Sequence, residues 1–265
     1  MTTHELFVSC WRLDPLAAVV CLGGGGAYVV TQKRLGARAF SFFGALLALA
    51  FVLASPVGAL AEGYLFSAHM LQHLVLVLVV PPLALLGLPP MEMRPLRRVL
   101  DRLPLRATTA WGLGVGAMWL WHAPTLCNAA SQNAIVLRVQ EISLLAMGAA
   151  FWWPVLGPNV DARLSAPGGI VYLFTACVAC TLLGILVTFS PVELCSVFLH
   201  PVDRLGVMPL LREQWGLTPQ RDQQIGGLLM WVPACLVYGA GILALVGKMM
   251  RADADDADVA TKGAT

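Results

Sequence analysis

The chain is 265 residues long, 58% hydrophobic and only 12% charged, with a formal net charge of +2. Its charged fraction is about half of that in soluble domains, and uncharged runs of about 20 residues recur along it. A polytopic membrane protein explains both features, whereas a soluble fold would have to bury too many apolar runs. The small net charge gives no indication of nucleic-acid binding.

Apolar stretches that are long enough to cross a bilayer predict an all-α bundle of about seven transmembrane helices. Residues 1–251 form one predicted transmembrane domain, and the acidic residues 252–265 are predicted to be a disordered tail. The predicted spans are Pro15–Val30, Phe40–Leu60, Tyr64–Gly87, Ala107–His122, Ala134–Leu156, Gly168–Phe189 and Ile225–Val246.

Two segments need a separate interpretation. The apolar run that begins near Pro15 has no basic n-region and no small-residue cleavage site, so we expect an uncleaved first span. The basic segment Pro89–Arg106 repeats leucine and valine at helical spacing. This pattern predicts a short amphipathic helix on the membrane surface.

Lysine and arginine lie mainly on one side of the predicted topology. If the N-terminus is outside and the C-terminus is cytoplasmic, the basic loops after the first and third spans face the cytoplasm. The outer side then holds only Arg12, Arg204, Arg212 and Arg221. The positive-inside bias therefore predicts this orientation.

Two histidines lie one turn apart at the outer end of the third predicted span. His69 and His73 are four positions apart, so they share one helix face with Cβ atoms about 5–6 Å apart. Polar side chains in a bilayer are unfavourable and usually face a bundle interior or a cavity, which makes the pair a candidate functional site. His122 ends the fourth span at a similar predicted depth.

Imidazole is a good ligand for zinc and copper, and a thioether favours copper(I). We therefore predict His69, His73 and His122 as metal ligands, with copper as the expected metal. Nearby groups can support such a site, by donating sulfur or by accepting a hydrogen bond that fixes an imidazole tautomer. These accessory candidates are Met70, Met118, Glu141, Asp222 and Gln223.

The same residues also have structural interpretations. Histidines near an interface can hydrogen-bond across helices, Glu141 can pair with Arg138, and Asp222 can favour a helix N-terminus. His4 and His200 lie in flexible or loop segments and are not expected to be ligands.

The seven cysteines are an odd set without paired spacing, so no disulfide framework is expected. Cys177 and Cys180 fall within an apolar span, where small, buried, inert thiols are the expected interpretation. A soft-metal or redox role is the alternative.

Motifs that occur in order along nearly the whole chain form a specific set. They are Trp11–Pro15, His69–His73, Pro81–Leu83, Leu86–Pro89, Trp121–Pro124, Phe151–Pro154, Leu186–Ser190 and Asp222–Pro233. Together they resemble the CtaG family of cytochrome c oxidase assembly proteins, the multi-span type first associated with caa-type oxidases. Family members often have a histidine directly after the glutamate of the fifth helix, whereas Ile142 follows Glu141 here. A site that used that histidine would lack one ligand.

The resemblance implies a bacterial inner-membrane protein that helps to mature a haem–copper oxidase, with copper delivery as the expected contribution. Oxidase subunits or other assembly factors are the implied partners, besides the lipid bilayer. Catalysis is not expected, because the sequence has no nucleophile–base pattern, phosphate-binding loop or dinucleotide fingerprint.

Two other functions remain as alternatives. A haem-binding electron carrier could place His69 or His73 opposite His122 as axial ligands. A copper or proton transporter would need polar groups that continue to the inner side, and the inner halves of the predicted spans contain few.

Overall fold

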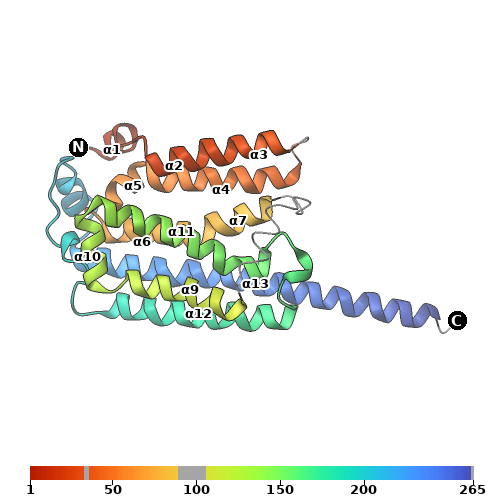
Figure 1. Ribbon diagram of the computed structural model, residues 1–265. Coiled ribbons are helices and arrows are strands. Elements are labelled where there is room, and N and C mark those ends of the chain that lie inside the picture. The colour runs from red at the N-terminus through yellow and green to blue at the C-terminus, as the bar shows by residue number, and fades with distance from the viewer. Residues whose placement is uncertain (33–35, 89–105, 264–265) are drawn as a thin grey trace.

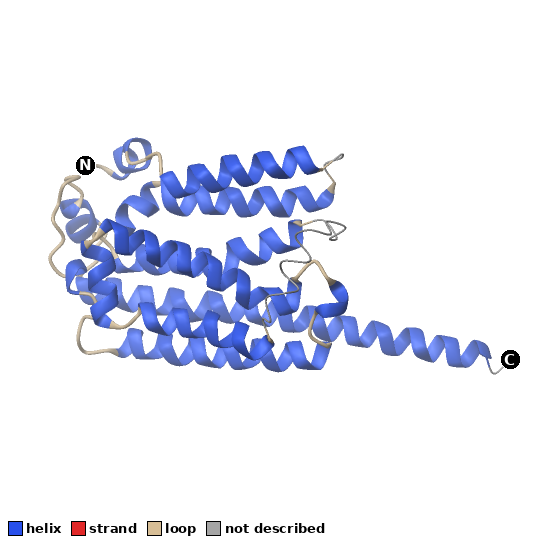
Figure 2. Cartoon of the chain, viewed as in Figure 1, coloured by secondary structure: helices blue, strands red, loops and turns tan. Residues whose placement is uncertain are grey.

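A computed structural model describes residues 1–32, 36–88 and 106–263, and the regular structure in these ranges is entirely helical (Figure 2). The helices lie side by side in one bundle, from which α13 (Pro219–Gly263) projects at one end (Figure 1). The opposite end carries the N-terminus and α10 (Pro124–Gln132), and we call it the α10 end. The all-α prediction is confirmed for the described residues.

Helices occur in all seven predicted spans, but they differ in length. Five are long and apolar enough to cross a membrane, whereas α9 and the α2–α3 rod are shorter. The count of seven spans and the orientation of the termini therefore stay predictions. The helices are α2–α3 (Pro15–Thr31), α4 (Ala37–Ala54), α6–α7 (Phe66–Gly87), α9 (Ala107–Trp121), α11 (Ala134–Leu156), α12 (Ala166–Phe189) and α13.

The outer surface of the bundle is apolar where these helices are longest. Phe40 on α4, Phe174 on α12 and Leu236 on α13 are all largely exposed. Soluble proteins rarely leave so many large apolar side chains uncovered. A surrounding lipid phase provides the missing apolar contact, so the surface fits a membrane protein.

The α6–α7 rod is hydrogen-bonded to α11 at the point where the prolines of the rod interrupt its backbone hydrogen bonds. Pro81 has no N–H, so the carbonyl of Val77 loses its usual partner four residues later. The indole Nε1 of Trp152 donates to this carbonyl at 3.2 Å. Gly148 allows the approach, because a Cβ there would lie 2.9 Å from the Cα of Val77. A side chain of α11 thus replaces the missing backbone donor.

A hydrophobic cluster that is separate from the main core of the bundle closes the α10 end. It joins α1 (Thr3–Ser9), α5 (Pro56–Ala61) and the connection 190–218 that follows α12. The hydroxyl of Tyr64 accepts hydrogen bonds from the amides of Arg204 and Leu205, at 2.9 and 3.1 Å. These contacts fix the connection over the ends of the long helices.

Three stretches differ from the predicted boundaries or lie beyond the described ranges. The second predicted span ends early, because Ser55 caps a new helix that starts at Pro56. α13 continues to Gly263 through the stretch predicted as a disordered tail, which is rich in alanine, the strongest helix former. The amphipathic helix predicted over 89–106 lies outside the described residues, except for Arg106.

Cys127 on α10 and Cys195 in the connection after α12 form a disulfide, with Cα atoms 5.9 Å apart. The expectation of no disulfide was wrong. The two cysteines are 68 positions apart and meet only because α9, α10 and α12 end together at the α10 end. Spacing along the chain carries no signal for such a pair. The other cysteines, all within the described ranges, are free: Cys10, Cys21, Cys177, Cys180 and Cys235.

Candidate functional site

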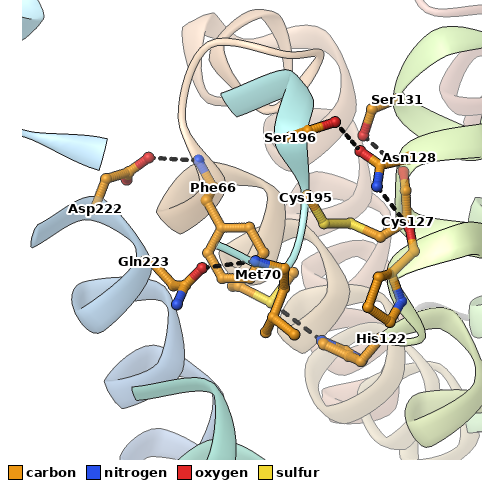
Figure 3. Close-up of a disulfide and its surroundings, with 12 residues drawn as sticks. Phe66, Met70, His122, Cys127, Asn128, Ser131, Cys195, Ser196, Asp222 and Gln223 are labelled. Carbon is orange, nitrogen blue, oxygen red and sulfur yellow. Dashed lines mark hydrogen bonds between the residues drawn. A yellow bond between two sulfur atoms is a disulfide. The ribbon is translucent and has the colours of Figure 1, made fainter. Parts of the chain in front are cut away.

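The helix that carries the histidine pair begins at Phe66 and is capped from another helix. The preceding residue, Leu65, has an apolar side chain that cannot satisfy the first free amides of α6 (Phe66–Leu74). Asp222 on α13 does so, accepting from the backbone amide of Phe66 at 2.7 Å (Figure 3) and from that of Ser67 at 3.0 Å. Gly226, one turn later, allows this approach, since a Cβ there would lie 2.5 Å from the Phe66 ring. α13 therefore fixes where the histidine helix starts.

Gln223, the neighbour of Asp222, also binds backbone groups. Its Oε1 accepts from the amide of Leu194 at 3.0 Å, and its Nε2 donates to the carbonyl of Val192 at 3.2 Å. Both predicted accessory residues of α13 thus organise the chain around the site. Their hydrogen bonds go to α6, to the carbonyl of Val187 on α12 and to the connection after α12, not to an imidazole.

His69 and His73 lie one turn apart on the buried face of α6. Each is only 1% exposed, and their ring centroids are 4.3 Å apart. Neither ring nitrogen of either residue has a hydrogen-bond partner among the described residues. A buried polar group without a partner costs about 1–3 kcal/mol, and native proteins rarely leave one without a functional reason. Four unpaired imidazole nitrogens in one place are the arrangement expected of a ligand-binding site.

His122 lies just after α9 and directs its two ring nitrogens to different partners. Its Nδ1 is 2.5 Å from the backbone oxygen of Met118, a contact that requires the proton to be on Nδ1. The other nitrogen, Nε2, then carries a lone pair and lies 3.1 Å from the thioether sulfur of Met70 (Figure 3). Two lone pairs that face each other without a proton between them suit a shared soft metal ion.

His73 lies next to both of the other imidazoles. The ring centroids of His73 and His122 are 5.4 Å apart, beyond the 4.3 Å between His69 and His73. In the part of the chain that the structure describes, no three His, Cys, Asp or Glu side chains form a ready-made metal-binding group. The three predicted ligands are therefore neighbours, but not a preassembled set. We call His69, Met70, His73 and His122 the histidine–methionine cluster.

Glu141, the predicted accessory acid of α11, is linked to the cluster helix through a glutamine. Its Oε1 accepts from Nε2 of Gln72 at 3.3 Å, and its Oε2 lies 2.7 Å from Nη1 of Arg138. Gln72 precedes His73 on α6. The structure thus shows the Arg138 pair that the sequence offered as the alternative, and an indirect connection to the histidines.

Arg138 is the centre of an ion-pair cluster that sequence reasoning missed. Its Nη1 lies 2.6 Å from a carboxylate oxygen of the buried Asp14, and its Nη2 lies 3.7 Å from Glu62. Glu62 in turn binds both terminal nitrogens of Arg12. The only signals in the sequence were charged residues at predicted helix starts. The cluster ties α2, α11 and the turn before α6 together at the α10 end.

A cavity of about 490 Å³ connects this region with the surface of the α10 end. The turn before α6, the junction of α10 and α11, and the connection after α12 supply its walls. His69 and His200 both line it, together with Arg138, Glu62 and Arg204. The structure therefore brings His200, which was set aside at the level of sequence, to the same cavity as His69.

The Cys127–Cys195 disulfide holds the connection against the cluster. The hydroxyl of Ser196 donates to the side-chain oxygen of Asn128 at 2.9 Å, next to the disulfide (Figure 3). Two residues later, the ring centroid of Phe198 lies 5.6 Å from that of His69. This covalent tether, which sequence reasoning also missed, keeps an aromatic ring against the histidine pair.

The thiols of the apolar spans lie at another interface. Sγ of Cys177 is 3.1 Å from Sγ of Cys235, and Sγ of Cys180 is 4.0 Å from the hydroxyl of Tyr238. Both contacts join α12 to α13. The partners of Cys177 and Cys180 are thus residues of the α12–α13 interface, not members of the histidine–methionine cluster.

Comparison with known proteins gives the chain a family. The model of the family described as the cytochrome c oxidase caa3 assembly factor (Caa3_CtaG) matches residues 26–252. The chain belongs to this family. This match confirms the family resemblance that the sequence motifs predicted.

Two uncharacterized proteins, from Mycobacterium bovis and Mycobacterium tuberculosis, are similar to this Caa3_CtaG protein. Each is 26% identical to it over 275 residues, which cover 93% of this chain. The chain spans only 40% of the length of these mycobacterial relatives. No solved structure matches it.

Within this Caa3_CtaG protein, the departure at Ile142 lies away from the cluster. Ile142 is 52% exposed, whereas the preceding Glu141 is buried. A residue at position 142 therefore faces outward from α11. Ile142 is thus not part of the histidine–methionine cluster of this chain.

Proposed function

We propose that this caa3 assembly factor supports the maturation of a haem–copper oxidase by holding copper(I) transiently at the histidine–methionine cluster. The observation that carries the proposal is the set of four buried, unpaired imidazole nitrogens of His69 and His73. Beside them, Nε2 of His122 faces the sulfur of Met70 at 3.1 Å. Copper is the cargo here, and the oxidase is the recipient.

The chemistry of the donors favours copper(I) over harder ions. Imidazole binds several transition metals, but a neutral thioether adds affinity mainly for soft ions such as copper(I). The carboxylates near the cluster, Glu141 and Asp222, are engaged by Arg138 and by backbone amides. Magnesium, calcium and manganese, which prefer carboxylate oxygen, therefore have little to bind at this site.

The α10 end is the side that we assign to the extracytoplasmic space of a bacterial inner membrane. The positive-inside bias predicts this orientation. The disulfide at this end supports it, because disulfides persist in oxidising compartments and are rare in the cytosol. Reporter fusions test the assignment: one after Arg251 should report cytoplasm, and one near Arg212 the opposite side. Both reporters on one side would contradict it.

The haem alternative receives less support from the geometry. His69 and His73 lie side by side on one helix face, with ring centroids 4.3 Å apart, so they cannot coordinate opposite faces of one haem. His122 already directs one nitrogen to a backbone carbonyl and the other to Met70. An absorption spectrum of the purified protein without a haem band agrees with the copper proposal.

A competitive copper(I) titration of the purified protein tests the proposal. The wild type should compete with a chromophoric chelator for copper(I), and changing His69, His73 and His122 together to alanine should abolish competition. Affinity should fall at low pH, because protons compete for imidazole nitrogen. His4→Ala, a change at an exposed position of α1, is the matched control. Equal binding by the triple variant and the wild type would refute the proposal.

A further inference from the structure

Only one member of the histidine–methionine cluster lines the cavity at the α10 end. That residue is His69, which is 1% exposed and has no hydrogen-bond partner for either ring nitrogen. A second imidazole, that of His200, lines the same cavity but is exposed. The cavity therefore has one imidazole at the surface and one at its buried side.

Other approaches to His69 are covered. The ring of Phe198 packs against His69 and against Phe66, with centroid distances of 5.6 and 5.7 Å. His73, the next residue of the cluster, covers another side of His69. The cavity is thus an open route from the surface to the buried imidazole of His69.

The loop that carries His200 is held firmly in place. The Cys127–Cys195 disulfide anchors its beginning, and the side chain of Arg212 donates to the carbonyl of Phe198 at 3.2 Å. His200 follows Phe198 by two positions, so these anchors also limit the movement of its imidazole. A ligand on a fixed loop pays less conformational entropy when it captures an ion.

We propose that this cavity is the entrance through which copper(I) reaches the cluster, and that His200 is the first protein ligand it meets. The inference rests on the proposed copper-holding function. The ion stays copper(I) throughout. A nitrogen of His200 first replaces one ligand of the complex that delivers the copper(I). A nitrogen of His69 then replaces His200. Each step exchanges one neutral donor for another, so no electron is transferred.

The charges around the cavity are largely balanced, which agrees with entry of copper(I) by ligand exchange and not by electrostatic attraction. Arg138 is matched by Asp14 and Glu141, and Arg12 by Glu62. Arg204 adds a positive charge to the wall. No excess of carboxylates draws in a hard cation, so the imidazoles are the groups that select the ion.

The test measures the rate of loading separately from the affinity. Copper(I) is presented as its bicinchoninate complex to the full-length protein in nanodiscs, and loss of the chelator absorbance is followed by stopped flow. His200→Ala should slow loading several-fold but leave the equilibrium affinity unchanged, because His200 is on the route and not in the cluster. Val192→Ala, a change at an exposed position of the same connection that does not line the cavity, should load like the wild type.

A second pair of variants tests the cavity itself. Ala134 lines the cavity at the start of α11, whereas the next residue, Ile135, is exposed and does not line it. Ala134→Trp should narrow the entrance and slow loading, and Ile135→Trp should not. The comparison keeps the added side chain and its helix constant, and it needs no change in any proposed ligand.

The outcomes separate the two proposals. A wild-type protein that takes no copper(I) from the probe overturns the proposed function and this inference together. Wild-type loading with unchanged rates in His200→Ala and Ala134→Trp overturns the inference alone. A loss of equilibrium affinity in His200→Ala equal to that in His69→Ala also overturns it, since His200 would then belong to the resting site.

Discussion

The carboxylate of Asp222 accepts a hydrogen bond from the backbone amide of Phe66 at 2.7 Å, across 156 positions of sequence. This contact makes the start of the histidine helix depend on the last long helix of the bundle. An N-terminal cap normally comes from the residue just before the helix, and here that residue is a leucine. The position of His69 and His73 is therefore set by tertiary structure, and α13 is part of the site without supplying a metal ligand.

Asp222→Ala should destabilise the protein by about 1–3 kcal/mol, because it leaves the amides of Phe66 and Ser67 buried and unpaired. Asp222→Asn should be milder, since the amide oxygen can still accept one of the two hydrogen bonds. Both changes should weaken copper(I) binding less than His73→Ala does. Thermal unfolding and chelator competition on the same samples measure the two effects. A loss of affinity in Asp222→Asn as large as that in His73→Ala would indicate a direct contact with the metal site.

Met70 and Met118 offer a matched test of sulfur ligation. Both are buried, but only the sulfur of Met70 faces Nε2 of His122, whereas Met118 contributes its backbone carbonyl. Leucine replaces methionine with little change in volume, so either substitution should cost less than about 1.5 kcal/mol of stability. Met70→Leu should weaken copper(I) binding, and Met118→Leu should leave it near the wild-type value. Equal affinities of the two variants, measured by chelator competition, would remove Met70 from the ligand set.

Arg138 should be among the most sensitive positions of the α10 end. Asp14 and Glu141 have side chains that are 1% exposed, and both depend on the guanidinium of Arg138 for charge compensation. Arg138→Leu should destabilise the protein by about 3–5 kcal/mol, as expected when a buried charge loses its partner. Adding Glu141→Gln should recover part of the loss, because it removes one of the stranded carboxylates. The midpoint of thermal unfolding for the single and double variants measures this coupling.

Most of the fold could be predicted from sequence because apolar periodicity and length reflect local physics. The third and fifth predicted spans, Tyr64–Gly87 and Ala134–Leu156, coincide closely with α6–α7 and α11. The break at Ser55 was missed because an apolar run hides a helix end when the capping residue is a single serine followed by proline. Local patterns locate helices well and their interruptions less well.

The site was harder to predict because its geometry depends on contacts between distant segments. The sequence indicated that His69, His73 and His122 would be neighbours, and the structure places His73 next to both of the others. Nothing in the spacing indicated that Asp222 would cap α6, or that Cys127 would bond to Cys195. Such partners depend on which helix ends meet in space.

The disulfide should contribute to stability as well as to the shape of the site. Cross-linking two residues that are 68 positions apart should stabilise the fold by about 4 kcal/mol in the loop-entropy description. Replacing Cys127 and Cys195 together by serine should lower the unfolding midpoint and make His69 more reactive toward an imidazole-modifying reagent, because Phe198 is released. The control replaces Cys177 and Cys235, which are free thiols at the α12–α13 interface. Unchanged stability and reactivity after removal of the disulfide would contradict this expectation.

The final prediction joins the cluster to oxidase assembly in the cell. In a strain whose only copy carries His69→Ala, His73→Ala or His122→Ala, oxidase turnover and copper per oxidase should fall, because each change removes a nitrogen donor. The amount of this protein in the membrane should stay constant, which immunoblots check. Added copper should restore part of the activity, since mass action refills a weakened site.

Arg98→Ala, a change on the predicted cytoplasmic side, is the control for this series and should leave oxidase activity near normal. The comparison distinguishes loss of copper delivery from general damage to the membrane protein. Full oxidase copper content in all three histidine strains would show that the histidines serve the packing of the bundle. Any role in oxidase assembly would then depend on contacts with partner proteins, since the metal would reach the oxidase without the cluster.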